Sequence, residues 1–450
     1  MEAKLEKRYG LITAIAMVIG IVIGSGVFFK AEKVLTATGG NLTLGILAWV
    51  IGGIIMISCA YTFAVMATKY QYVNGVVDYA EATLGKKYAY YVGWFMALIY
   101  YPTLTSVLAW VSARYTCVLL GFSITGGECM TIAGLYLIAS FALNSLSPIL
   151  AGKFQVSTTI IKLIPLALMA VIGTIVGVGN GMIAYNFTTV VKEVNTSNAL
   201  FTAVVATAFA YEGWIIATSI NAELKDAKKN LPLALVVGTF VIMIIYILYY
   251  IGLAGTVTNK VMMAGGEAGA KLAFQTVFSS VGGTLLFVFV IISCLGTLNG
   301  LMLGCTRGIY SLAARNIGPK PDVFKQVDNV TNMPTNSSVF GLLLCGIWLL
   351  YFYGANLTKP WFGFFSFDSS ELPIVTIYAL YIPIFIMMMK KEKDLSSFKR
   401  FIAPTISLAG CVFMIIAACF SHKMEVVAYL IVFAVVMIFG AMFSKEKIAE

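Results

Sequence analysis

Two glycine-containing segments of this chain bring backbone chemistry rather than side-chain chemistry. The first is Gly24-Ser25-Gly26, and the second is residues 209–214, Phe-Ala-Tyr-Glu-Gly-Trp. Both interrupt apolar stretches. A helix inside a bilayer can lose backbone hydrogen bonds only where protein, ligand or water replaces them, so each interruption predicts a lined cavity.

The first interruption predicts a site for an anion. Glycines on both sides of Ser25 let the chain leave helical geometry at low steric cost. The amides after the break then lie at a positive helix end, where a carboxylate is the natural ligand. The alternative is a small-residue packing seam, which Gly and Ser also favour between membrane helices. Matching interruptions in two repeats favour the binding site.

The second interruption predicts the complementary site. Carbonyls freed around Phe209 and Ala210 face an ammonium group, so the two breaks together suit a zwitterion. Phe209 lies one turn before Gly213 and is placed to close over a bound ligand. Ordinary helix packing is the alternative for a single phenylalanine.

Lys162 is the costliest residue of its apolar stretch. A cation at mid-bilayer costs about 2.5 to 3.5 kcal/mol on insertion scales. The residue is too deep to reach an interface comfortably, so we expect it to face the bundle interior and contact carbonyls or an anion. Arg114 and Glu212 are further intramembrane candidates, although Arg114 lies near the end of its stretch and can extend to the interface.

The composition is that of an integral membrane protein. Of 450 residues, 60% are hydrophobic and 11% are charged. A span needs about 20 mainly apolar residues. Twelve stretches qualify: 9–29, 43–68, 88–119, 129–150, 153–178, 198–221, 231–255, 284–314, 337–354, 370–389, 401–421 and 424–443. The first is read as a retained helix and not a signal peptide, because it is as long as a span.

The charges predict the orientation. With both termini in the cytoplasm, twenty-one Lys and Arg residues lie on the cytoplasmic side and seven on the other. The excess fixes this topology by the positive-inside rule. The net charge of +10 is thereby explained, and no nucleic-acid binding is expected.

The stretches form an internal repeat. The first five, over 9–178, align with the next five, over 198–389, and 401–443 holds two extra helices. Because five is odd, the second repeat enters the membrane from the opposite side, as in transporters whose site lies between inverted repeats. We expect one domain over 1–450, with a short amphipathic helix over 223–232 ended by Pro232.

No metal, cofactor or enzymatic activity is expected. His422 is the only histidine, and it is peripheral. The chain lacks a His, Cys and carboxylate cluster suited to acid-base or metal chemistry. A channel does not need two matched helix breaks.

The chain resembles the amino acid, polyamine and organocation (APC) superfamily, and within it the L-amino acid transporter family with its bacterial serine/threonine and alanine-serine-cysteine exchangers. The resemblance covers nearly the whole chain. It is most specific in four segments: Gly24 to Phe28, Phe209 to Trp214, Lys162 to Pro165, and Gly296 to Gly300. It implies an all-α, twelve-helix LeuT-like 5+5 inverted repeat with helices 1 and 6 broken. It also implies sodium-independent transport of neutral amino acids, commonly as exchange.

The resemblance also implies roles for individual residues. The substrate contacts in the first helix are Val22, Ile23, Gly24, Ser25 and Gly26, and those in the sixth are Phe209, Ala210, Glu212 and Gly213. Phe209 is similar to the family's aromatic gate. Lys162 matches the lysine that stands where sodium-coupled relatives hold a cation. Glu212 departs from the family, which usually has Gly or Asp there.

Alternatives to exchange follow from that departure. One is a proton-coupled symporter in which Lys162 or Glu212 changes protonation. Another is an antiporter of an amino acid and its amine, with Glu212 holding the cation. Animal members of the family pair with a glycoprotein, but here we expect a protein of the plasma membrane without an obligatory protein partner.

Overall fold

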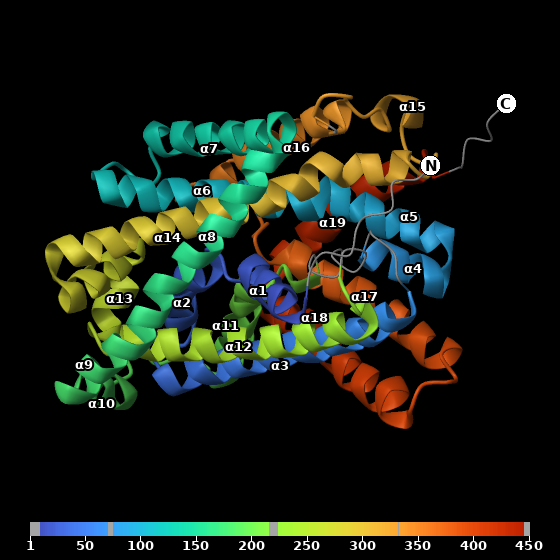
Figure 1. Ribbon diagram of the computed structural model, residues 1–450. Helices are drawn as coiled ribbons and strands as arrows, with labels where there is room; N and C mark the ends of the chain where they lie inside the picture. Colours follow the sequence, from blue (N-terminus) through green and yellow to red (C-terminus); the bar gives the residue numbers. More distant parts are fainter. Residues whose placement is uncertain (1–9, 71–74, 216–223, 332, 445–450) are drawn as a thin grey trace.

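The computed structural model describes residues 10–70, 75–215, 224–331 and 333–444, which form an all-helical protein (Figure 1). These residues contain no β-strand and include ten helices long and apolar enough to cross a membrane. The prediction of an all-helical membrane protein is confirmed to this extent. The predicted spans 9–29 and 198–221 are not among the ten, because the helices there are shorter.

The helices follow one another with short connections. Those of the first half are α1 (Leu11–Val22), α2 (Gly26–Ala37), α3 (Leu42–Lys69), α4 (Val76–Leu84), α5 (Lys86–Phe95), the π-helix η1 (Met96–Tyr100), α6 (Tyr101–Leu120), α7 (Gly127–Leu146), α8 (Pro148–Leu168), the π-helix η2 (Met169–Gly173), α9 (Thr174–Gly179) and α10 (Met182–Thr188). Those of the second half are α11 (Thr196–Tyr211), α12 (Ala227–Ala254), α13 (Asn259–Gly265), α14 (Glu267–Ala313), α15 (Pro321–Phe324), α16 (Thr335–Ala355), the 3₁₀-helix η4 (Gly363–Phe365), α17 (Leu372–Lys391), the π-helix η5 (Phe398–Ile402), α18 (Ala403–His422) and α19 (Met424–Ala441).

Local sequence sets several of these boundaries. The Asn41 side chain accepts a hydrogen bond from Leu44 N at 3.0 Å, and the Asn195 side chain accepts one from Asn198 N at 3.1 Å. Such caps satisfy amides that a helix start leaves unpaired. Gly121 ends α6 in the left-handed conformation, with φ 77°, which glycine adopts without steric cost.

The predicted helix over 223–232 is wrong where the structure describes it. α12 begins at Ala227 and continues through Pro232 to Ala254. A proline inside a membrane helix is tolerated where neighbouring groups replace the lost backbone bond. The apolar run after Pro232 therefore keeps one helix where the proline alone predicted an end. Glu223 lies outside the described residues.

The two short helices α1 and α2 lie in the middle of the bundle (Figure 1). On one side they face α3 and α12, which pack along each other. On the other side lies α14, which packs against α6 and α8. α2 also packs against α11. The interruption between α1 and α2 is therefore enclosed by long helices.

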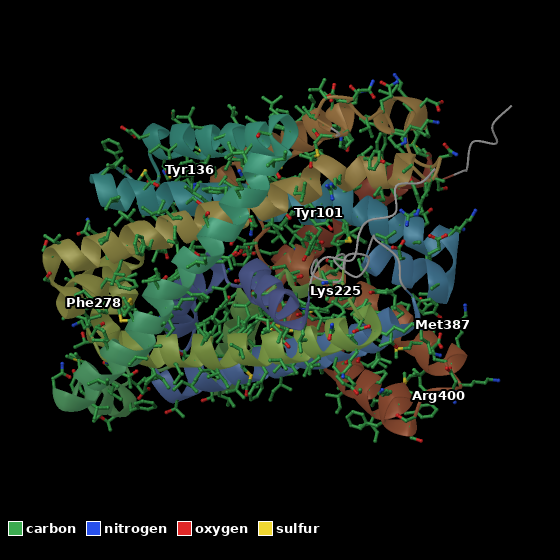
Figure 2. All side chains as sticks on the ribbon, in the orientation of Figure 1. Tyr101, Tyr136, Lys225, Phe278, Met387 and Arg400 are labelled. Atoms are coloured by element: carbon green, nitrogen blue, oxygen red, sulfur yellow. The ribbon has the colours of Figure 1, made fainter. Side chains whose placement is uncertain are left out.

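The bundle has two ends, which we name by their residues. The His422 face carries Glu371, just before α17, and His422, at the end of α18. The Lys69 face carries Lys69, at the end of α3, and Glu392, just after α17. Figure 2 shows Met387 and Arg400 at the end of the Lys69 face, and Phe278 at the opposite end.

Candidate functional site

The first predicted interruption is present in the structure. α1 ends at Val22, Ile23 is extended with ψ 107°, and α2 begins at Gly26. Phe29 N bonds to Ser25 O at 2.8 Å, which is the first backbone bond of the new helix. The amides that open α2 precede it and have no acceptor within the helix. The break therefore presents donors in the middle of the bundle.

The glycines at this break serve close packing. A Cβ on Gly24 would lie 2.1 Å from Thr297 Oγ1, and one on Gly26 would lie 2.4 Å from Ala210 Cα. Neither glycine has a positive φ. The expected reason, freedom to leave helical geometry, is thus corrected: any side chain at these positions collides with α14 or α11.

The second helix ends at the predicted place. α11 stops at Tyr211, and Glu212 is extended with ψ 161°. Gly213 has φ 103°, a conformation that L-residues with side chains rarely adopt. Residues 216–223, which follow this end, lie outside the described part of the chain.

The two helix ends meet. Gly26 contacts the backbone of Ala210 closely enough to exclude a Cβ. Ser25 is fully buried, and its hydroxyl has no hydrogen-bond partner among the described residues. The Tyr246 hydroxyl, from α12, reaches Val22 O at 3.3 Å and Ala210 O at 3.1 Å. The meeting point thus combines helix-start amides, helix-end carbonyls and one unpaired hydroxyl.

Glu212 extends this site towards α6. The Tyr100 hydroxyl donates to Glu212 Oε1, and Tyr100 is the last residue of the π-helix η1. π-turns are frequent at functional sites because they redirect side chains within a helix. Oε2 of Glu212 is buried without a hydrogen-bond partner in the described part of the chain. One carboxylate oxygen is therefore available to a ligand or a proton.

Phe209 lies against α2 on the side of the His422 face. Its ring meets Phe29 edge to face, with centroids 6.0 Å apart. Lys30 Nζ lies 5.3 Å from the centroid of the Phe209 ring and 5.1 Å from that of Phe29. A cation at this distance from a ring is attracted to its face. The three side chains together cover the meeting point of the helix ends.

An ion-pair network closes the same side. Lys30 Nζ lies 2.5 Å from Glu371 Oε1, and His422 Nε2 lies 3.0 Å from Glu371 Oε2. His422 Nδ1 lies 3.4 Å from Glu425 Oε2. The pair therefore ties α2 to the start of α17 and the end of α18. A cavity of about 400 Å³ next to it is lined by Lys33, Glu371 and His422 among others.

Lys162 lies apart from this closure. It is fully buried, as expected, and its ammonium donates to Gly20 O in α1. The contact joins α8 to the helix that precedes the first break. Arg114 pairs with Glu267 at 2.8 Å and covers the Trp110 ring. It therefore belongs to neither part of the candidate site.

The structure brings most of the predicted residues together. Those at the meeting of the helix ends are Val22, Ile23, Gly24, Ser25, Gly26, Phe209, Ala210, Glu212 and Gly213. Four contributors were missed: Tyr100, Tyr246, Lys30 and Glu371. Lys30 carried a signal, since it is a charge four residues after Gly26. Tyr246 carried none, because Tyr249 and Tyr250 follow it in the same helix.

Known proteins share this sequence over nearly its whole length. The serine/threonine exchanger SteT of Bacillus subtilis (strain 168) is 29% identical over 418 residues, covering 91% of each chain. The b(0,+)-type amino acid transporter 1 of Mus musculus is 24% identical over 435 residues, covering 95% of this chain and 86% of its own. The glutamate/serine transporter AimA of Bacillus subtilis (strain 168) is 25% identical over 372 residues, with 78% and 67% covered.

The sequence pattern of the amino acid permease family matches residues 9–443. This match spans both helix breaks, Lys162 and the network at the His422 face. The chain therefore belongs to the amino acid permease family, within the APC superfamily.

Proposed function

We propose that this permease exchanges neutral L-amino acids across the plasma membrane, independently of sodium and by alternating access. The observation that carries the proposal is the meeting of two helix ends, with Gly26 against Ala210 and the Ser25 hydroxyl unpaired. Relatives named as a serine/threonine exchanger and as amino acid transporters support it.

Each end of an amino acid has a counterpart at this meeting point. The substrate carboxylate is held by the amides that open α2, since a helix start carries partial positive charge. The ammonium is held by carbonyls at the ends of α1 and α11, including Ala210 O. Phe209 closes over the ligand, and the substrate side chain extends towards Glu212.

Lys162 supports sodium independence. Its buried ammonium lies against Gly20 O, one turn before the first break. A fixed cation at this place holds α1 to α8 without a bound ion. The same carbonyl cannot coordinate sodium while it accepts this hydrogen bond at close range.

The proposed architecture has twelve spans in one domain, with two inverted repeats of five and two extra helices. α1 with α2 forms the first broken span, and α11 begins the second. The His422 face is extracellular and both termini are cytoplasmic, as the positive-inside rule predicts. The protein works in the membrane without a cofactor, an enzymatic reaction or an obligatory protein partner.

Counterflow in proteoliposomes tests exchange. Vesicles containing the purified protein are loaded with unlabelled L-serine or L-threonine, and uptake of the labelled amino acid is measured in sodium and in choline buffer. We expect rapid uptake that needs internal substrate and does not depend on sodium. Equal uptake into empty vesicles overturns obligatory exchange, and loss of uptake in choline overturns sodium independence.

A second candidate function rests on the free oxygen of Glu212. A buried carboxylate oxygen without a partner suits a proton or a substrate ammonium group, so the alternatives are proton symport and exchange for an amine. Accumulation in empty vesicles under an imposed pH gradient supports symport. Competition by amines supports amine exchange, and neither result is expected if the exchanger takes only neutral amino acids.

A further inference from the structure

The Tyr246 hydroxyl lies where the two interrupted helices meet. It contacts Val22 O at 3.3 Å and Ala210 O at 3.1 Å. Val22 ends α1, and Ala210 lies in the last turn of α11. An α-helix has no backbone donor for the carbonyls of its last turn. Tyr246 therefore supplies a donor that both helices lack.

The position of this hydroxyl is set by packing. Tyr246 is fully buried. Its ring stacks on Tyr211 with centroids 5.3 Å apart, and it meets Trp49 edge to face at 5.6 Å. The Tyr211 hydroxyl in turn donates to Trp49 O at 2.9 Å. Aromatic contacts on two sides keep the ring in place, so the hydroxyl stays at the helix ends.

The two hydrogen bonds satisfy the carbonyls incompletely. A phenol carries one hydrogen, which must be shared between Val22 O and Ala210 O. Hydrogen bonds from hydroxyls to oxygen are usually about 2.7 to 2.8 Å long, and both contacts here are longer. An ammonium group carries three hydrogens and a full charge, so it is the stronger donor for the same oxygens.

We propose that Tyr246 is a positioning residue that stands in for the substrate ammonium when the carrier is empty. This inference rests on the proposed function. In states open to either face, water pairs with the helix-end carbonyls. In the closed empty carrier the Tyr246 hydroxyl takes this role, and in the loaded carrier the substrate ammonium takes it.

Tyr246 therefore sets how strictly the protein exchanges. Without the hydroxyl, the closed empty carrier holds two buried carbonyls that lack this donor, which raises the barrier to its return. The loaded carrier is unaffected, because the substrate supplies the hydrogens. Removing one buried hydrogen-bond donor is expected to slow the empty return by about tenfold and to change exchange by less than about twofold.

The experiment compares Tyr246→Phe with the wild type in proteoliposomes loaded with labelled L-serine. Efflux is measured into buffer containing L-serine, which reports exchange, and into buffer without it, which reports return of the empty carrier. The expected result is a fall in efflux without external serine and preserved exchange. An equal fall in both rates, or no change in either, overturns the proposal.

Tyr249→Phe is the matched control. Tyr249 is also a buried tyrosine of α12, and its hydroxyl has no hydrogen-bond partner in the described residues. The same chemical change there should leave both rates as in the wild type. A selective loss of empty return in Tyr249→Phe also overturns the assignment to Tyr246.

Thermal unfolding in detergent gives a second readout that does not need transport. For Tyr246→Phe we expect a lower melting temperature without ligand and a larger upward shift with saturating L-serine than in the wild type. Equal shifts indicate a purely structural role and overturn the proposal. Failure of the proposed function is recognised separately, because the wild type itself then shows neither serine exchange nor a serine-induced shift.

Discussion

Two buried glutamates lie in different regions of the molecule and have opposite surroundings. Glu371, at the His422 face, is 6% exposed, and Glu212, at the meeting of the helix ends, is 8% exposed. Glu371 faces Lys30 and His422, whereas Glu212 Oε1 faces the Tyr100 hydroxyl and Oε2 is unpaired within the described residues. Burial alone therefore does not distinguish a closing contact from a ligand site, but the partners do.

The largest expected effect tests whether the centre is the substrate site. In Gly26→Val the new side chain collides with Ala210, and overpacking of this kind corresponds to about 10- to 100-fold in a rate or binding constant, and more where backbone cannot move. We expect serine counterflow to fall by at least about 100-fold. Gly134→Val is the control, since a Cβ there meets no atom within 4 Å.

Size-exclusion profiles must show that both valine variants are folded before their rates are compared. Equal counterflow in Gly26→Val and Gly134→Val would contradict the central site. The comparison of the two glutamates would then lose its functional half.

The next effect concerns the paired glutamate. Glu371→Gln leaves the buried Lys30 without its counter-charge, which costs about 3 to 5 kcal/mol when one partner of a buried pair is removed. We expect a clear fall in melting temperature in detergent. Glu425→Gln, which changes the more exposed carboxylate beside His422, should have a small effect. Equal melting temperatures for the two variants would show that the closing pair does not stabilise this state.

Glu212→Gln should behave in the opposite way. The Tyr100 hydroxyl can still donate to the amide oxygen, and no cation among the described residues loses a partner. We expect stability to change by less than about 1.5 kcal/mol, within the usual range for one hydrogen bond. The exchange rate should become independent of pH between 5.5 and 8 if Glu212 carries a proton or a cation. A loss of stability as large as that of Glu371→Gln would remove the distinction between the two glutamates.

The smallest effect is expected for an exposed carboxylate at the Lys69 face. The hydrogen bond from Lys69 lowers the pKa of Asp394, so this pair stabilises the folded state above the ordinary aspartate pKa and ceases to do so as the pH falls through the lowered value. Because Asp394 is exposed, the contribution is screened by salt. Asp394→Asn should lower the melting temperature slightly at pH 7 and not at all in concentrated salt. A large, salt-resistant loss would show that exposure is a poor guide to the strength of these pairs.

The sequence allowed the helix interruptions and the burial of Lys162 to be predicted, because both follow from local chemistry. Glycines within an apolar stretch mark a break, and a lysine far from either end of a span must find an interior partner. The contact of Lys30 with Glu371 joins residues 341 positions apart, and no local pattern encodes it. Tyr246 could not be selected for a similar reason, since only the fold shows which tyrosine of α12 reaches the helix ends.

The structure also changed the reason given for two residues. Gly24 and Gly26 were expected to provide backbone freedom, but they provide room for Thr297 and Ala210. Spacing along the chain shows where a small residue occurs. It does not show which neighbour requires the space, because that neighbour belongs to another helix.

The backbone contact between Gly26 and Ala210 bears on how such a carrier diversifies. Main-chain amides and carbonyls offer the same grip to every α-amino acid, so changing what is carried does not require altering this grip. Mutations that widen or narrow the diet of the protein are then confined to the wall around Glu212 and Tyr100. Directed evolution of new cargo should begin at that wall and leave the glycines untouched.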